Sequence, residues 1–180
     1  RELRSELEAK GYQFRSKTDS EVVLNALTAW GVKALDRFNG MFALAFWDRE
    51  EKKLLLARDR YGIKPLYYSE QGLSFSFASE QKAILSNSEF RRDLDKAALL
   101  EYFTFQNIFT NRTLTEGISM LPAGHFALLD CNKAKPQLQL TQYWDFHFRE
   151  PEQKASDEEY REELNRLFQQ AVNRQLISDV

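Results

Sequence analysis

Cysteine is nearly absent from this 180-residue sequence, which contains Cys131 alone. A single thiol cannot form a disulfide within the chain, and this favours a reducing compartment, so we expect a cytoplasmic protein. The longest apolar run, Met41 to Trp47, is far too short to span a bilayer. The formal net charge is −2, so no broad basic surface indicates a nucleic-acid or membrane partner.

Residues that hold metals and phosphates are also scarce. The two histidines, His125 and His147, lie far apart in the sequence, and no metal-binding spacing is present. The sequence has no Gly-rich phosphate loop and no Gly-x-Ser-x-Gly motif. We therefore expect no metal site and no cofactor in these residues. Cys131 lies between two predicted strands without a partnered base, a setting in which a thiol is more often inert than nucleophilic.

Hydrophobic periodicity predicts both helices and strands. Helices are expected at residues 2–11, 18–31, 32–40, 79–86, 94–106 and 156–176. Strands are expected at residues 12–16, 41–48, 54–59, 65–69, 73–79, 124–130 and 138–146. The segment 41–48 is apolar on both faces, which predicts a fully buried strand. Hairpins surrounded by helices predict an α+β layered fold with a largely antiparallel sheet.

Capping residues mark the starts of three of these helices. Thr18 with Glu21 and Ser156 with Glu159 have the spacing of a capping box, and Asp95 is a candidate cap.

The polar, proline-containing segment 149–155 is typical of a linker. The helix that follows it has an apolar stripe, which indicates packing against a further domain. The sequence begins with Arg1, within a helical pattern, so we expect a fragment.

Asp19 is a candidate binding residue. It follows a predicted strand and begins a helix, where an acidic side chain is stabilised by the helix dipole. A carboxylate in the same place could instead bind the ammonium group of a ligand. Residue type and position leave both interpretations open.

The sequence "RDRYGIKP", residues 58–65, forms a polar corner between two predicted strands. A contact between Arg58 and Asp59 would orient the loop, because the guanidinium group is a rigid donor. Gly62 allows a turn with positive φ, and Pro65 fixes the start of the next strand. We favour the interpretation that this corner is a structural loop without a role in binding or catalysis.

Seven stretches together resemble the glutamine-hydrolysing (B-type) asparagine synthetases. They are "RSKTDSEVVLNAL", "LDRFNGMFALAFWD", "LLARDRYGIKPLYY", "FASEQKAIL", "LPAGHFALLD", "YWDF" and "LISDV". Each stretch alone is a weak signal, but seven in this order are highly specific. The Arg-Asp-x-x-Gly-x-x-Pro-Leu corner also occurs in other class II glutamine amidotransferases, and "YFTFQNIF" and "LPAGH" favour the asparagine synthetase branch.

This resemblance implies an Ntn-hydrolase glutaminase domain, an αββα sandwich, over residues 1–149. Residues 150–180 would be a linker and the first helix of an adenylating synthetase domain. Glutamine hydrolysis would supply ammonia to aspartate activated by ATP and Mg²⁺ in that second domain. The implied partners are glutamine and the protein's own synthetase domain, and a homodimer is also an expected assembly.

The family's N-terminal cysteine nucleophile, its glutamine-carboxylate arginine and its Asn-Gly-Glu-Ile-Tyr-Asn run have no counterpart in these residues. We therefore expect no catalytic residue and no glutaminase activity in the isolated chain. One family position carries over, because "SKTDSEV" matches the stretch whose aspartate binds the α-amino group of glutamine. The resemblance thus implies that Asp19 is a glutamine-binding residue and that Arg58, Asp59 and Gly62 are structural. Two alternatives are an amidotransferase for another acid, such as a surface-polysaccharide precursor, and a non-catalytic scaffold.

Overall fold

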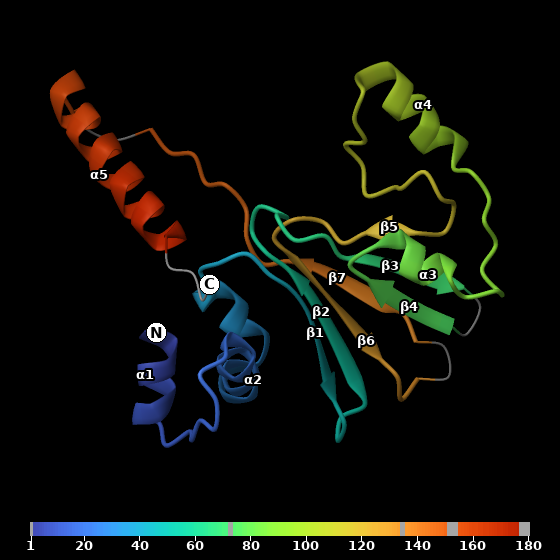
Figure 1. The fold of residues 1–180 in the computed structure, drawn as a ribbon, viewed down its shortest axis with the longest axis horizontal. Coiled ribbons are helices and arrows are strands. Elements are labelled where there is room, and N and C mark those ends of the chain that lie inside the picture. The colour runs from blue at the N-terminus through green and yellow to red at the C-terminus, as the bar shows by residue number, and fades with distance from the viewer. Residues whose placement is uncertain (1, 72–73, 134–135, 151–154, 177–180) are drawn as a thin grey trace. The chain divides into compact units, whose positions relative to one another are not determined.

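The computed structural model describes residues 2–71, 74–133, 136–150 and 155–176. It divides into two compact units, Arg1–Asp145 and Phe146–Val180 (Figure 1). The helices are α1 (Glu2–Ala9), α2 (Asp19–Trp30), the 3₁₀ helix η1 (Gly31–Arg37), α3 (Gln81–Leu85), α4 (Lys96–Phe105) and α5 (Asp157–Gln175). The strands are β1 (Ala43–Asp48), β2 (Lys53–Arg58), β3 (Tyr67–Gln71), β4 (Ser74–Ala78), β5 (Ser119–Met120), β6 (His125–Asp130) and β7 (Leu138–Gln142).

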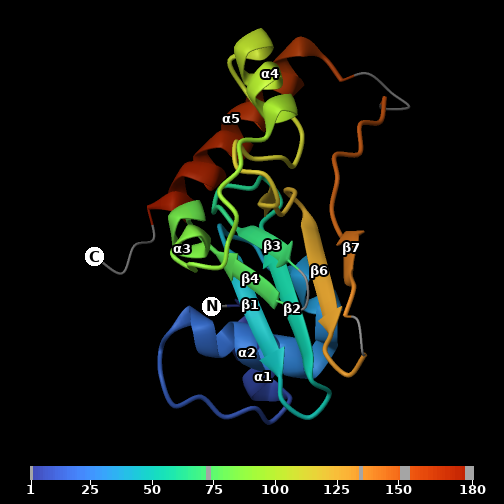
Figure 2. The same ribbon diagram turned by 90° about the vertical axis from the view of Figure 1, so that its right-hand side faces the viewer.

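The strands of the first unit form two sheets, in which all pairs of neighbours are antiparallel. The larger sheet has the order β1-β2-β6-β7, and the smaller sheet has the order β4-β3-β5. In the larger sheet β2 lies between β1 and β6, which places Leu55 opposite both Phe46 and Leu128 (Figure 2). The predicted α+β fold with largely antiparallel sheet is therefore confirmed.

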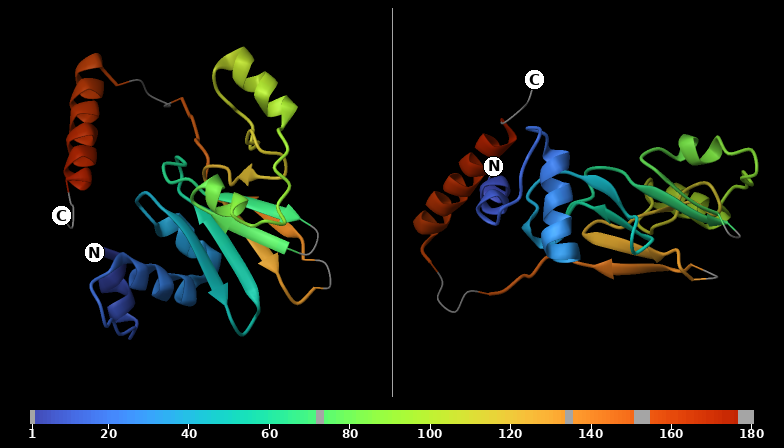
Figure 3. Two further views of the ribbon diagram at one scale, coloured as in Figure 1. Left: turned by 45° about the vertical axis from the view of Figure 1, so that its right-hand side comes forward. Right: turned by 90° about the horizontal axis from the view of Figure 1, so that it is seen from below.

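Alternation along β2 separates two layers of core. Leu55 and Ala57 pack with α1, α2 and η1 on one face of the larger sheet. Leu54 and Leu56 point to the opposite face and pack against residues of the smaller sheet, among them Tyr68. The outer face of the smaller sheet is covered by α3, which contributes the buried Ile84 (Figure 3). The resulting order is helix, sheet, sheet, helix, which is the αββα sandwich.

The strand predicted at residues 12–16 is wrong. This segment is irregular, and the N–H group of Tyr12 donates to the carbonyl of Leu7 at 3.0 Å, which closes the end of α1. Tyr12 and Phe14 pack their rings on the core between the helices and the larger sheet. Two alternating aromatic residues are too short a pattern to specify a strand where no neighbouring strand pairs with them.

The fully buried strand predicted at residues 41–48 is also wrong in its burial. The strand begins at Ala43 and lies at an edge of the larger sheet, and its side chains are half-buried or exposed. Met41 is 50% exposed and Trp47 is 46% exposed. The buried strand is its neighbour β2, in which the last five residues are buried. Apolar content on both faces therefore did not distinguish an edge strand from a central one.

The caps agree with the prediction at two helices and differ at one. Asp95 caps α4, and Ser156 and Glu159 form both bonds of a capping box at α5. Thr18 is the N-cap of α2, but its side chain makes no capping hydrogen bond. The Glu21 carboxylate binds earlier residues instead, so the capping box predicted at α2 is wrong.

The second unit contains α5, in which no residue is buried. Parts of two predicted segments, residues 72–73 of the second hairpin and 151–154 of the linker, lie outside the described residues. Within the described chain, no helix is both long enough and apolar enough to cross a membrane.

Candidate functional site

Asp19 is the first residue of α2, and its side chain is exposed. Thr18 before it has φ −72° and ψ 151°, an extended conformation that turns the chain into the helix. No described residue forms a hydrogen bond or ion pair with the Asp19 carboxylate. Its position in the first turn is favourable to a negative charge because of the helix dipole. The carboxylate is therefore stabilised by the helix while its oxygens stay free to accept from a ligand.

The loop before Asp19 is bound to α2 by Glu21. The Glu21 carboxylate accepts from the N–H groups of Arg15 at 2.8 Å and Ser16 at 2.7 Å, and from the Ser16 hydroxyl at 2.7 Å. The Arg15 N–H, followed by the hydroxyl and N–H of Ser16, lowers the pKa of the Glu21 carboxyl below its usual value. From the other side, Arg4 of α1 donates to the carbonyl of Thr18 at 3.4 Å. The loop next to Asp19 is thus ordered by two charged side chains.

The polar corner at residues 58–65 is organised by Asp59, which is 1% exposed. One carboxylate oxygen accepts from the N–H groups of Tyr61 at 3.1 Å and Ile63 at 3.0 Å. The other oxygen accepts from Lys64 at 3.0 Å and Phe42 at 3.2 Å. One side chain therefore satisfies four backbone donors and fixes the loop in a single conformation.

Arg58 binds carbonyl groups of the same corner. It donates to the carbonyls of Lys64 at 2.8 Å, Leu121 at 2.8 Å and Gly62 at 2.5 Å. Burial lowers the pKa of its guanidinium group below the usual value. The expected contact between Arg58 and Asp59 is not formed among the described ion pairs, because each side chain is occupied by the backbone.

Gly62 and Tyr143 complete this corner. Gly62 has φ +64°, as its predicted turn requires, and a Cβ atom there would lie 3.0 Å from the Arg58 guanidinium. The Tyr143 hydroxyl donates to the carbonyl of Arg58 at 2.8 Å. The polar groups of Arg58, Asp59 and Tyr143 described here all bind partners within the protein, which is what the predicted structural role of the corner requires.

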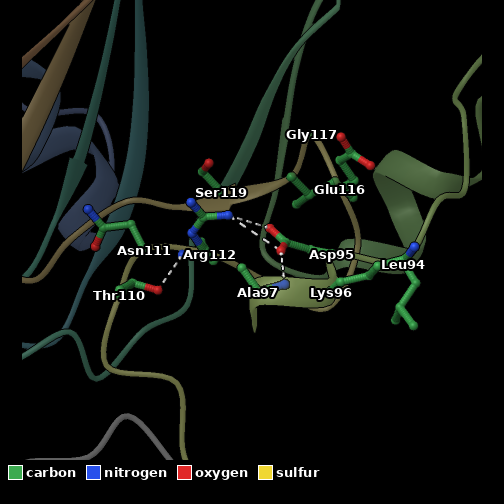
Figure 4. A pocket seen from close by; sticks show the side chains of 11 residues that line it. Leu94, Asp95, Lys96, Ala97, Thr110, Asn111, Arg112, Glu116, Gly117 and Ser119 are labelled. Carbon is green, nitrogen blue, oxygen red and sulfur yellow. Dashed lines mark hydrogen bonds and ion pairs between the residues drawn. The ribbon is translucent and has the colours of Figure 1, made fainter. Parts of the chain in front are cut away.

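A cavity of about 830 Å³ lies between the start of α4, the segment 110–112 and β5 (Figure 4). Figure 4 shows Arg112 beside Asp95, and the two form an ion pair at 3.0 Å. Asp95 also accepts from the N–H groups of Ala97 and Ala98, and the Ala98 bond is the main cause of its lowered pKa. Two of the charged residues that line this cavity, Asp95 and Arg112, are thus already engaged in capping and pairing.

The structure does not join the candidate residues into one cluster. Asp19 lies at the start of a helix on the outer face of the larger sheet, whereas Asp59 follows the end of β2. Cys131 is exposed and begins the turn after β6, where its N–H donates to the Lys52 carbonyl at 3.0 Å. Among the described residues, no group of three or more His, Cys, Asp or Glu side chains could hold a metal ion.

Two contributors were missed by sequence reasoning. Glu21 was assigned to a capping box, but it binds the preceding loop, and Tyr143 was counted only as a strand residue. The role of Glu21 could have been predicted from the sequence, because a glutamate in the first turn of a helix can accept from free N–H groups of the residues before the helix. Arg15 and Glu21 lie within seven residues of each other. The bond from Tyr143 to Arg58 spans 85 positions and leaves no local signal.

The fold of this chain is similar to that of a solved amidotransferase structure. A solved structure of the glutamine phosphoribosylpyrophosphate amidotransferase from Bacillus subtilis, complexed with ADP and GMP, superposes with a TM-score of 0.50 at 16% sequence identity. The match covers 79% of this chain and 26% of that one. At this identity the likeness concerns the fold, which is that of an Ntn-hydrolase amidotransferase domain.

Residues 1–144 match the family described as glutamine amidotransferase domain. The chain belongs to this family. It is 36% identical over 180 residues to asparagine synthetase (glutamine-hydrolyzing) 3 of Bacillus subtilis, and 32% identical over 184 residues to a putative asparagine synthetase (glutamine-hydrolyzing) of Mycobacterium tuberculosis. Each match covers 99% of this chain and 28% of the relative, so the chain spans about a quarter of their length. The alternatives of another acid acceptor or a scaffold are not favoured by these relatives.

Proposed function

We propose that this chain is the glutaminase part of a glutamine-hydrolysing asparagine synthetase. The observation that carries the proposal is Asp19, an exposed carboxylate without a partner among the described residues, in the stretch "SKTDSEV" of the family motif. Asp19 binds the α-ammonium group of glutamine, and ammonia released from the amide is transferred to aspartate. The names of the relatives support the part of the proposal that concerns the asparagine synthetase.

The chemistry fits the position of Asp19. An ammonium group and a carboxylate form a charge-assisted hydrogen bond, which is stronger than a neutral one. A negative charge in the first turn also interacts favourably with the helix dipole. The nucleophile and oxyanion donors would come from outside this chain, so the isolated 180-residue polypeptide is proposed to be inactive toward glutamine.

The remaining assignments follow from the same proposal. Residues 150–180 are a linker and the first helix of the synthetase domain, which takes ATP, Mg²⁺ and aspartate. Within the part of the chain that the structure describes, no residue is assigned to ATP or Mg²⁺. A cytoplasmic location and a homodimer are also proposed, and cell fractionation and light scattering test them.

The test of the proposed site is Asp19→Ala in the complete protein. Glutamine-dependent asparagine formation should lose on the order of 2–4 kcal/mol in kcat/KM, because the ammonium group of glutamine is left unpaired. Free ammonia does not use this site, so ammonia-dependent formation should be unchanged. Both activities are measured on the same preparation.

Asp157→Ala is a matched control, since Asp157 is the first residue of another helix. It removes the same helix-dipole interaction, worth about 0.3–1 kcal/mol of stability, without touching glutamine. If Asp19→Ala behaves like this control and leaves glutamine kinetics unchanged in a folded protein, Asp19 is not part of the site.

A further inference from the structure

The segment of residues 15–18 connects the core-packed Phe14 with the start of α2, and we call it the 15–18 loop. Within the described residues this loop pairs with no strand, and side chains supply its tethers. Three hydrogen bonds from it converge on the Glu21 carboxylate, at 2.8, 2.7 and 2.7 Å. Such convergence on a single acceptor makes Glu21 the main determinant of the loop's conformation.

Asp19 and Glu21 have different roles although they are only two positions apart in the sequence. Residues at i and i+2 of a helix point in different directions, so the two carboxylates do not share one ligand. The Glu21 oxygens are filled by the loop, whereas Asp19 has no partner among the described residues. We propose that Glu21 is a positioning residue that fixes the 15–18 loop, and thereby directs the Asp19 carboxylate toward the ammonium group of glutamine. This inference rests on the proposed function of Asp19.

A chain of contacts leads from Glu21 to Asp19. The Ser16 hydroxyl that donates to Glu21 lies 2.8 Å from the Thr18 hydroxyl, and the Thr18 N–H donates to the Ser16 oxygen at 3.3 Å. Thr18 is the N-cap of α2 and sets the backbone direction just before Asp19. Losing the Glu21 carboxylate frees two N–H groups and a hydroxyl at once, which releases the backbone that precedes the binding residue.

The experiment is a double-mutant cycle in the complete protein with Asp19→Ala, Glu21→Ala and the pair together. For Glu21→Ala the KM for glutamine should rise about tenfold with kcat little changed, since a disordered loop weakens ground-state binding. When Asp19 is already absent, Glu21→Ala should add little, because its effect passes through Asp19. Ammonia-dependent synthesis should be the same in all variants.

The control is Glu8→Ala, which removes the same charge from an exposed position of α1 and should leave the KM for glutamine unchanged. Glu21→Gln keeps one carbonyl oxygen as an acceptor, so its KM should lie between wild type and Glu21→Ala, and it serves if the alanine variant does not fold. Hydrogen exchange of residues 12–18 should accelerate in Glu21→Ala and less in Glu21→Gln.

The outcomes separate this inference from the proposed function. If Asp19→Ala lowers glutamine turnover but Glu21→Ala leaves KM unchanged, or adds its full effect to Asp19→Ala, Glu21 does not position Asp19. If Asp19→Ala itself leaves glutamine kinetics unchanged, the proposed function fails, and the inference fails with it. A tenfold rise in KM that disappears in the Asp19→Ala background supports both.

Discussion

Asp59 is 1% exposed and Arg58 is 9% exposed, and burial of an ionised group costs free energy unless hydrogen bonds offset it. The two neighbours could have neutralised each other, yet each binds backbone groups of opposite polarity. Asp59 accepts from four N–H groups, and Arg58 donates to three carbonyls. The loop between two strands of different sheets is thereby held without regular secondary structure.

Asp59→Asn tests this account of the corner. An asparagine has one acceptor oxygen, whereas Asp59 uses both of its oxygens, so two backbone donors lose their acceptor. We expect the free energy of unfolding to fall by on the order of 2–6 kcal/mol, at about 1–3 kcal/mol for each of the two unsatisfied donors. Urea unfolding followed by circular dichroism measures the change.

Asp48→Asn is the matched control for this variant. Asp48 accepts from the N–H groups of Glu50 and Glu51 through one oxygen, which an asparagine retains. The control should change the free energy of unfolding by less than about 1 kcal/mol. Equal losses in the two variants would show that Asp59 does not depend on its second oxygen.

Tyr143 adds a pH dependence. Burial raises the pKa of Tyr143 to about 12, and its hydroxyl donates to the carbonyl of Arg58. Because the pKa in the folded state exceeds the unfolded value of about 10, this contribution is complete below pH 10 and is lost as the pH rises toward 12. Tyr143→Phe should cost about 0.5–1.5 kcal/mol at pH 8 through the lost hydrogen bond.

The measurement is the difference in unfolding free energy between wild type and Tyr143→Phe at pH 8, 10 and 11.5. The difference should narrow above pH 10, because the phenol then ionises in the unfolded protein while it stays protonated in the folded protein, which favours unfolding of the wild type alone. Other groups that titrate in this range are common to both proteins and cancel. A constant difference across the range would contradict the raised pKa of Tyr143 in the folded protein.

At the residue scale, the sequence predicted which side chains matter better than what they contact. The polar corner was expected to be structural, and the turn at Gly62 was expected from its residue type. The partners of Arg58 include the carbonyl of Leu121, 63 positions away, which no local pattern encodes. Glu21 was misassigned because a glutamate three residues after an N-cap can either form a capping box or bind N–H groups of the preceding loop. The sequence spacing is the same in both cases.

Caps were the most predictable features of the elements. Asp95 and Ser156 behave as expected because their partners lie within the first turn of their own helices. Strand burial was less predictable, since it depends on neighbours from distant parts of the chain. The central position of β2 arises from its pairing with β6, whose residues follow about seventy positions later. Local apolar content carries no information about such pairing.

The backbone directly before β6 requires a glycine at position 124. Gly124 has φ +65°, and a Cβ atom there would lie 2.5 Å from the carbonyl oxygen of Trp144. Gly124→Ala must displace backbone and also adopt a strained conformation, which costs on the order of 1–3 kcal/mol for the conformation alone. We expect a loss of at least this size in the free energy of unfolding, measured by urea denaturation.

Gly40→Ala provides the comparison, because a Cβ atom at Gly40 would meet nothing within 4 Å and its φ is not in the left-handed region. This variant should be neutral or stabilising by about 0.4–1 kcal/mol through the unfolded state. A similar loss in both variants would mean that the close approach to Trp144 is not the cause.

At the scale of the whole molecule, periodicity predicted an α+β fold, but the order of the layers came from the family resemblance. The structure explains this order by the alternation in β2, whose odd-numbered core residues meet the helices and whose even-numbered ones meet the second sheet. The structure divides after Asp145, and the assignment of residues 150–180 to a synthetase domain stays a prediction.

The helix α5 is expected to be weakly protected in the isolated chain. None of its residues is buried, and Leu164 and Phe168 are 69% and 66% exposed. A helix of this kind is stabilised by its capping box and by pairs such as Glu163 with Arg166, which contribute little when exposed. We therefore expect α5 to open locally with a much smaller free energy than β2, whose side chains are buried.

Native-state hydrogen exchange should show rapid exchange of residues 157–175 and slow exchange of residues 53–58. Because exposed apolar residues favour association, the measurement is repeated at two protein concentrations. Equal protection of the two segments in a dilute monomer would contradict the assignment of α5 to a unit of its own.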